Sequence, residues 1–85
     1  MLNVIFTKRA QEDYHYFSKT KPTVRQRIDQ LIQAIQLDPF HGIGKPETLR
    51  FNLSGYWSRR IDKEHRLVYK VYEDTLYIVQ CRYHY

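Results

Sequence analysis

The sequence predicts an α+β fold in which two N-terminal helices pack on one face of a mostly antiparallel sheet of four to five strands. Three observations predict it. A short apolar run near the N-terminus precedes two segments whose apolar residues recur every three or four positions, the period of a helix face. A Gly- and Pro-rich loop follows, and beyond it come three segments of alternating polarity. Their connections are short enough for antiparallel hairpins.

The first half of the chain supplies the first strand and both helices. Residues 2–6, LNVIF, are apolar and partly β-branched, which is typical of a strand. Residues 8–19 have three apolar side chains at spacings of four and three, so we expect a helix there. Pro22 predicts the start of a second helix, to about Leu37, because its missing N–H costs nothing in a first turn. The loop DPFHGIGKPE, residues 38–47, ends that helix.

The second half supplies three strands, expected at residues 56–61, 66–72 and 75 to about 83. Successive residues of a strand point to opposite faces, and a two-residue turn at Glu73 and Asp74 carries the pattern across the last hairpin. The face expected beneath the helices holds Leu67, Tyr69, Val71, Leu76 and Ile78. The face expected to stay open holds Arg66, Val68, Lys70, Tyr72, Tyr77, Val79 and Cys81. Cations and aromatic rings on an open sheet are the composition that binds single-stranded nucleic acid.

Composition narrows the function classes. The formal net charge of +5 favours a polyanionic partner. Cys81 is a single cysteine and is typical of a reducing compartment. Since no apolar run reaches the roughly 20 residues of a membrane span, we expect a cytoplasmic protein without a membrane partner. Residues 1–85 are expected to form one domain.

Cofactor and metal sites are not expected. The four histidines are scattered, and Cys81 with His84 is the closest pair of soft ligands, which is too few for a zinc site. The loop sequence GIGKPE lacks the glycine spacing of a phosphate-binding loop and has Pro46 where a helix should begin.

Acid and base chemistry on a phosphate remains. Cleaving RNA without a metal requires a base for the 2′-hydroxyl, an acid for the leaving 5′-oxygen, and cations for the charge that builds at phosphorus. The chain has residues of these types at Lys45, Glu47, Arg50, Arg60, Arg66 and His84. Each of them alone is equally typical of a solvated surface, so these residues by themselves indicate only a small basic α+β domain.

A longer match adds to this interpretation. The segment GKPETLRFNLSGYWSRRIDKEHRLVYKV, together with CRYHY at the C-terminus, closely resembles the YoeB toxins, also called the Txe family, of the RelE superfamily. The likeness covers nearly the whole chain. It implies a RelE-like toxin domain with the fold of small microbial ribonucleases. It also implies a ribosome-dependent endonuclease that cleaves mRNA in the ribosomal A site and inhibits translation.

The resemblance assigns catalytic roles to particular residues. Glu47 corresponds to the general base of the family and His84 to its general acid. Arg66 corresponds to the arginine that holds the scissile phosphate. Tyr85 matches a terminal tyrosine implicated in activity, and Glu64 matches an acidic residue that supports the site.

The expected contacts with RNA and with proteins follow from the same reasoning. Arg60 is expected as a second cation at the phosphate, and Arg59, Lys45 and Arg50 as further RNA-binding residues of the basic face. The implied partners are the ribosome with its rRNA, mRNA, and a cognate acidic antitoxin of the YefM or Axe type. A second copy of the chain is a further candidate partner.

The position of His84 leaves one structural question open. Strict alternation from the Glu73 and Asp74 turn places Tyr83 on the Arg66 face and His84 on the opposite one. Either the last strand ends before His84, or a β-bulge shifts the alternation.

Two functional alternatives also stay open. A basic module could inhibit translation by occupying the ribosome without cutting mRNA, and it would need only the cations. A protein-interaction domain could use the open sheet to accept a partner strand or helix.

Overall fold

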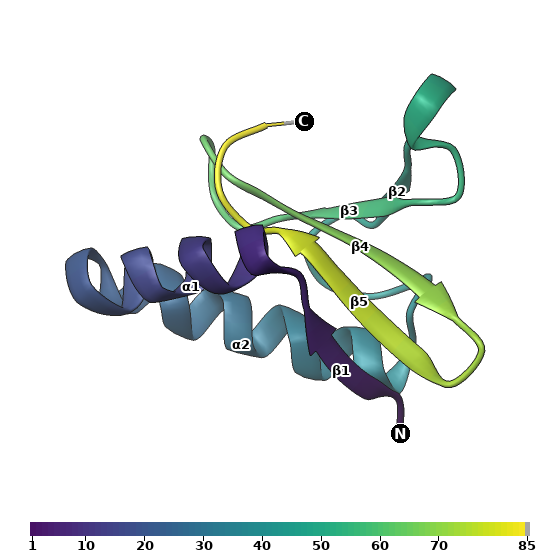
Figure 1. The fold of residues 1–85 in the computed structure, drawn as a ribbon, viewed down its shortest axis with the longest axis horizontal. Coiled ribbons are helices and arrows are strands. Elements are labelled where there is room, and N and C mark those ends of the chain that lie inside the picture. The colour runs from purple at the N-terminus through teal and green to yellow at the C-terminus, as the bar shows by residue number, and fades with distance from the viewer. Residues whose placement is uncertain (85) are drawn as a thin grey trace.

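The computed structural model describes residues 1–84 and confirms the predicted fold class. In this part of the chain the order of elements is β1 (Asn3–Phe6), α1 (Lys8–Thr20), α2 (Pro22–Leu37), β2 (Glu47–Thr48), a 3₁₀ helix η1 (Phe51–Leu53), β3 (Trp57–Arg60), β4 (Arg66–Tyr72) and β5 (Thr75–Gln80). The five strands of residues 1–84 form one sheet in the order β1-β5-β4-β3-β2. Both helices lie on one side of the sheet, and η1 and the C-terminal end rise on the other (Figure 1).

The pairing of the strands explains why the sheet is mixed. β5 pairs antiparallel with β4, β4 with β3, and β3 with β2, as short hairpin connections require. β1 pairs parallel with β5. The two helices carry the chain from β1 at one edge of the sheet to β2 at the other edge, and the three antiparallel pairings then bring β5 back beside β1. Within residues 1–84, no helix has the length and apolar character needed to cross a membrane.

The two helices begin differently, α1 at a side-chain cap and α2 at a proline. The Thr7 side chain accepts a hydrogen bond from the Ala10 N–H at 3.1 Å, which caps α1, and its hydroxyl donates to the carbonyl oxygen of Val79 at 2.8 Å. Thr7 therefore ties the start of α1 to β5. Pro22 is the first residue of α2, as predicted.

The core lies between the helices and the sheet face predicted to be covered. Leu67, Tyr69, Leu76 and Ile78 are fully buried there, and Val71 packs at the edge of the cluster. The helices contribute Ala10, Phe17, Ile28, Leu31, Ile32 and Ile35. The assignment of the covered face from alternation is therefore confirmed for β4 and for β5 as far as Ile78.

The alternation fails after Ile78, because β5 contains a bulge. Tyr69 pairs with Ile78 but Val68 pairs with Gln80, so Val79 is an extra residue in β5. The prediction that Cys81 lies on the open face is wrong: Cys81 is fully buried in the helix-side core. β5 also ends at Gln80, not at residue 83. Both alternatives posed for the position of His84 are thus realised, an early end of the strand and a bulge.

Burial of Cys81 predicts a specific loss of stability at alkaline pH. Burial, and next the nearby Asp13 carboxylate, raise the pKa of the Cys81 thiol to about 12. In the unfolded chain the thiol ionises near pH ~8.5. The folded state therefore keeps the thiol proton to a higher pH than the unfolded state does. The stabilisation that the protonated thiol provides is complete below about pH 8.5. Above that pH the free energy of unfolding declines toward pH ~12, by up to about 1.4 kcal/mol per pH unit.

Urea unfolding between about pH 8 and pH 11 measures this decline. Cys81→Ala should be less stable at about pH 8 because it leaves a cavity, but its stability should fall less steeply with pH than that of the unaltered protein. Equal slopes in the two proteins would contradict a buried thiol.

Candidate functional site

A row of four paired residues crosses the open face of the sheet. Residues that pair across neighbouring strands point to the same face. From β2 to β5 the row is Glu47, Ser58, Val68 and Gln80. Ser58 and Val68 are buried in the middle, so the expectation that Val68 lies on an open sheet surface is wrong, whereas Glu47 at one end is exposed. Three strand spacings of about 4.8 Å put the two ends of the row roughly 14 Å apart.

Glu47 owes its position to a close approach of the preceding loop. The carbonyl oxygen of Gly44 accepts a hydrogen bond from the Arg60 N–H at 2.7 Å, which joins the loop to β3 just before β2 begins. Gly44 has φ of +86°, and a Cβ there would lie 2.9 Å from the Cδ2 atom of Leu31. Glycine is the residue that fits both conditions, so it lets β2 bring Glu47 alongside Ser58.

Arg59 does not lie on the open face, so the expectation that it is an exposed RNA-binding residue of the basic face does not fit its position. It pairs with Leu67, on the helix side of the sheet, and its exposed fraction is 0%. Its guanidinium donates hydrogen bonds at 2.8 to 3.2 Å to the Tyr69 hydroxyl and to the carbonyl oxygens of Asp38, His41 and Ile43. These partners occupy the guanidinium, which therefore holds the loop of residues 38–43 against the sheet.

The other predicted cations are placed where a phosphate can reach them. Lys45, Arg50 and Arg60 are exposed. Arg60 pairs with Arg66, so two arginines stand directly opposite each other on the open face. The Arg66 guanidinium donates to the carbonyl oxygens of Asp62, at 2.7 Å, and of its neighbour His65, at 3.1 Å. Two like charges in this arrangement repel each other.

The C-terminal segment, residues 81–84, is held against the start of β4. The Tyr83 N–H donates to Nδ1 of His65 at 2.8 Å, and the Tyr83 carbonyl oxygen accepts from the Arg66 N–H at 3.0 Å. Tyr83 has φ of +65°, a left-handed conformation that turns the chain. The Gln80 side-chain amide then donates to the His84 carbonyl oxygen at 3.5 Å. His84 therefore lies at the Gln80 end of the row, and Tyr85 lies outside the described residues.

A second contact fixes this segment to α1. The guanidinium carbon of Arg82 lies 3.6 Å from the centre of the Tyr16 ring and 4.6 Å from the centre of the Tyr83 ring. A cation over aromatic faces at these distances is attractive. The segment that carries His84 is thus anchored to α1 through Arg82 and to the start of β4 through Tyr83.

His65 is a residue at this site that the sequence interpretation missed. It is 5% exposed, and its ring packs edge-on against Phe17 at 5.0 Å. Because Nδ1 accepts the Tyr83 N–H, the ring proton belongs on Nε2, which lies 3.9 Å from the Glu64 carboxylate. Glu64 itself is exposed and lies beside this anchor. The residues next to His65 gave no signal for this role, because it depends on a contact 18 positions along the chain.

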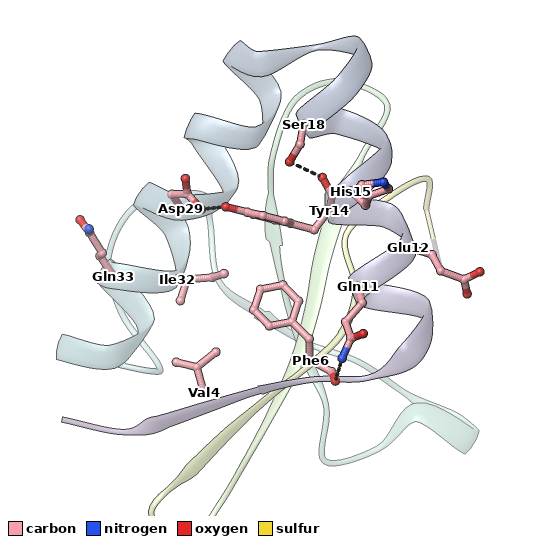
Figure 2. Close-up of a pocket in the computed structure, with 10 residues that line it drawn as sticks. All are labelled: Val4, Phe6, Gln11, Glu12, Tyr14, His15, Ser18, Asp29, Ile32 and Gln33. Atoms are coloured by element: carbon pink, nitrogen blue, oxygen red, sulfur yellow. Dashed lines mark hydrogen bonds between the residues drawn. The ribbon is translucent and has the colours of Figure 1, made fainter.

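A large hollow among the described residues is remote from this site. It measures about 910 Å³ and lies between α1, α2 and β1, with Val4 and Phe6 at its base (Figure 2). The Tyr14 side chain extends across it, and the Tyr14 hydroxyl donates a hydrogen bond to Oδ1 of Asp29 at 2.7 Å (Figure 2). Burial, and next this hydrogen bond, raise the pKa of Tyr14. None of the predicted site residues lines this hollow, so size alone does not identify the site.

Comparisons with known proteins agree on one family. A family model described as "YoeB-like toxin of bacterial type II toxin-antitoxin system" matches residues 6–85. Toxin YoeB of Streptomyces coelicolor is 54% identical over 99% of this chain and 100% of its own length.

Solved structures extend the agreement. The YoeB/ParE toxin from Agrobacterium tumefaciens has a TM-score of 0.97 at 40% identity, covering 99% of this chain and 100% of its own. A YoeB dimer from Staphylococcus aureus (46% identity, covering 99% and 98%) and a YoeB–YefM complex from that species (45%, covering 100% and 99%) have TM-scores of 0.92 and 0.91.

The two adjacent arginines of β3 should differ sharply in their effect on stability. Arg59→Ala removes a buried guanidinium and leaves its carbonyl partners unpaired, so it should lower the free energy of unfolding by about 3 kcal/mol or more. Arg60→Ala should change it by less than about 0.5 kcal/mol, or raise it by relieving the repulsion from Arg66. Urea unfolding measures both. Equal losses would contradict the burial of Arg59.

The His65 anchor should be visible in amide exchange. His65→Phe keeps an aromatic ring but removes the acceptor, so the Tyr83 amide should exchange with solvent about fivefold faster or more, since about 1 kcal/mol or more of protection is lost. His65→Asn is the matched control, because its side-chain oxygen takes nearly the place of Nδ1 and should preserve slow exchange. Unchanged exchange in His65→Phe would show that Tyr83 is held by other contacts.

Proposed function

Because the chain belongs to the YoeB-like toxins of bacterial type II toxin–antitoxin systems, we propose that it is a ribosome-dependent endoribonuclease that cleaves mRNA in the ribosomal A site. Residues 1–85 act as a single toxin domain that inhibits translation. One observation carries the proposal: Glu47 and the segment bearing His84 lie at opposite ends of one row across the open face, next to paired arginines.

The proposed chemistry is a transesterification at phosphorus. The Glu47 carboxylate takes the proton of the 2′-hydroxyl, and the 2′-oxygen attacks the adjacent phosphorus. The bond from phosphorus to the 5′-oxygen then breaks, and protonated His84 gives its proton to that oxygen. The products end in a 2′,3′-cyclic phosphate and a 5′-hydroxyl. Attack and departure occur on opposite sides of phosphorus, and a row roughly 14 Å long leaves room for a phosphate between the two side chains.

The paired arginines supply the electrostatic part. Arg60 and Arg66 repel each other when no anion is bound, and a phosphate between them attracts both guanidinium groups and offsets that repulsion. The same pair stabilises the negative charge that builds on the phosphate oxygens in the transition state. Lys45 and Arg50, both exposed, hold flanking phosphates.

Two further residues complete the proposed site. Glu64 supports it from beside His65, at the anchor of the C-terminal segment. Tyr85 acts next to the acid, and for this residue the assignment rests on the family resemblance alone. No cofactor or metal ion is part of the proposed mechanism.

The proposed partners are the ribosome, mRNA and a cognate acidic antitoxin. YefM is the partner in the complex of the Staphylococcus aureus relative, and an antitoxin of the YefM or Axe type is proposed for this chain. An acidic segment would neutralise the toxin by occupying the arginines that otherwise hold phosphate. The dimer of the same relative supports a homodimer as the form without antitoxin.

Mapping mRNA 5′ ends on translating ribosomes tests the proposed function. Glu47→Ala and His84→Gln should each lower the cleavage rate by roughly 10² to 10⁴ while ribosome affinity stays nearly unchanged. Arg66→Ala should lower both the cleavage rate and the ribosome affinity, because a contact with the phosphate acts in the ground state as well as in the transition state. Glu12→Ala, which removes an exposed carboxylate of α1, is the control and should leave both unchanged. Parallel loss of binding and cleavage in the first two variants would assign those residues to docking.

A further inference from the structure

Phe51 combines two features that are individually unfavourable for a free protein. Its φ is +59°, a left-handed conformation that bulky residues rarely adopt. Its ring is 90% exposed, although it begins the 3₁₀ helix η1 and sits within a folded segment. Backbone strain of this kind persists where the surrounding structure enforces it, and it concentrates at ligand-binding sites.

The surrounding segment does enforce this conformation. The Leu49 N–H donates to the Tyr56 carbonyl oxygen at 3.0 Å and closes the base of the loop. Inside the loop, the Tyr56 N–H donates to the Leu53 carbonyl oxygen at 3.1 Å, and the Ser54 N–H donates to the Phe51 carbonyl oxygen at 3.0 Å. Leu49 is buried beneath them. The loop therefore holds the Phe51 ring out in solvent.

The ring shares a hollow with the proposed general base. This hollow, about 800 Å³ in volume, is lined by residues that include Glu47, Arg50, Phe51 and Asn52. η1 and the C-terminal segment rise on the same side of the sheet, the side without helices (Figure 1). An RNA strand held across the row would therefore pass the Phe51 ring at the Glu47 end.

The chemistry around the ring favours a nucleobase as its partner. Arg50 and Asn52 flank Phe51 in the sequence, and both are exposed and polar. A flat aromatic face beside a cation matches a base and its phosphate. The hollow also has apolar lining residues that a peptide would contact, namely Pro46, Leu49, Leu53 and Trp57. The exposed Arg50 cation beside the ring favours a partner that carries phosphate. We propose that Phe51 is a stacking subsite for a base of the RNA strand next to the phosphate between Arg60 and Arg66. This inference rests on the proposed function.

Three substitutions of Phe51 test the flat ring separately from its apolar character. Phe51→Tyr keeps the ring, Phe51→Leu keeps only the apolar side chain, and Phe51→Asn removes both but suits a left-handed backbone. In cleavage of mRNA on purified ribosomes, the Asn and Leu variants should raise the apparent KM between about 5-fold and 100-fold. The Tyr variant should stay within about twofold. A Leu variant equal to the unaltered protein, or an Asn variant within twofold, would overturn the proposal.

Two controls separate stacking from folding. Phe51→Asn relieves backbone strain and exposes no core, so its melting temperature should be equal to or higher than that of the unaltered protein. A lower melting temperature would show that Phe51 is structural. Leu37→Asn removes another exposed apolar side chain, at the end of α2 on the helix side of the sheet, and should leave the apparent KM unchanged. An equal effect at Leu37 would show that exposed apolar side chains act without a specific subsite.

The source of the base is identified by mRNA with an abasic A-site nucleotide. If Phe51 stacks on mRNA, the difference between the unaltered protein and Phe51→Asn should disappear on abasic mRNA. If the difference persists on abasic mRNA, Phe51 stacks on rRNA, and that result would overturn the placement of the base beside the phosphate between Arg60 and Arg66. Loss of binding to the antitoxin with unchanged cleavage would overturn the proposal in favour of a protein contact.

A binding measurement separates this inference from the proposed function. If the unaltered protein does not cleave mRNA, the proposed function fails. A single-stranded RNA hexamer should still shift the Phe51 ring resonances in an NMR titration, and the shift should be absent with its abasic counterpart. Equal shifts with both oligonucleotides, or none with either, would overturn the stacking subsite.

Discussion

The buried guanidinium of Arg59 is the interaction on which the candidate site depends. A buried charge is tolerated only when its hydrogen-bonding groups find partners, and here the partners are backbone carbonyls of one loop together with the Tyr69 hydroxyl. Tyr69 in turn donates to the Pro39 carbonyl oxygen at 2.6 Å. A loop rich in glycine and proline has little regular structure of its own, so these hydrogen bonds fix the conformation of residues 38–43. The hydrogen bond from the Arg60 N–H to the Gly44 carbonyl oxygen then holds the end of the loop beside β3, and this positions β2 and Glu47.

The other end of the site depends on an irregularity in β5. The extra residue at Val79 turns Gln80 onto the open face and Cys81 into the core. His65 and its neighbour Arg66 then take both backbone groups of Tyr83 as hydrogen-bonding partners. Glu47 and the segment that bears His84 are thus positioned by separate features, a charged network at one end of the row and a bulge with an anchored segment at the other.

Period and alternation predicted what depends on local pattern. The helices and the covered face of β4 follow from spacing alone, and so they were predicted correctly. The adjacent arginines of β3 show the limit of such reasoning. Arg59 alternates with Trp57, which packs against the core, and this signal could have placed Arg59 inside. Because its side chain is charged, Arg59 was instead expected to be exposed to solvent.

Other features could not be derived from local pattern. β2 has only two residues, and its pairing with β3 depends on how the preceding loop is held. The bulge depends on how β5 meets both β4 and α1, where Thr7 bonds the Val79 carbonyl oxygen. The roles of Glu47 and His84 came from a family resemblance, and the contribution of the structure is to place them at the two ends of one row.

The proposed acid–base mechanism is tested most directly by one atom of the substrate. Ribosomes are programmed with mRNA that carries a single 2′-deoxynucleotide on the 5′ side of the cleaved phosphate, and the cleavage rate is compared with that of the all-ribose mRNA. The 2′-oxygen is the nucleophile of the mechanism, so cleavage at that phosphate should be abolished while cleavage at neighbouring sites and ribosome binding persist. Cleavage at an undiminished rate across the deoxynucleotide would mean that water or another group attacks phosphorus, and would contradict the roles given to Glu47 and His84.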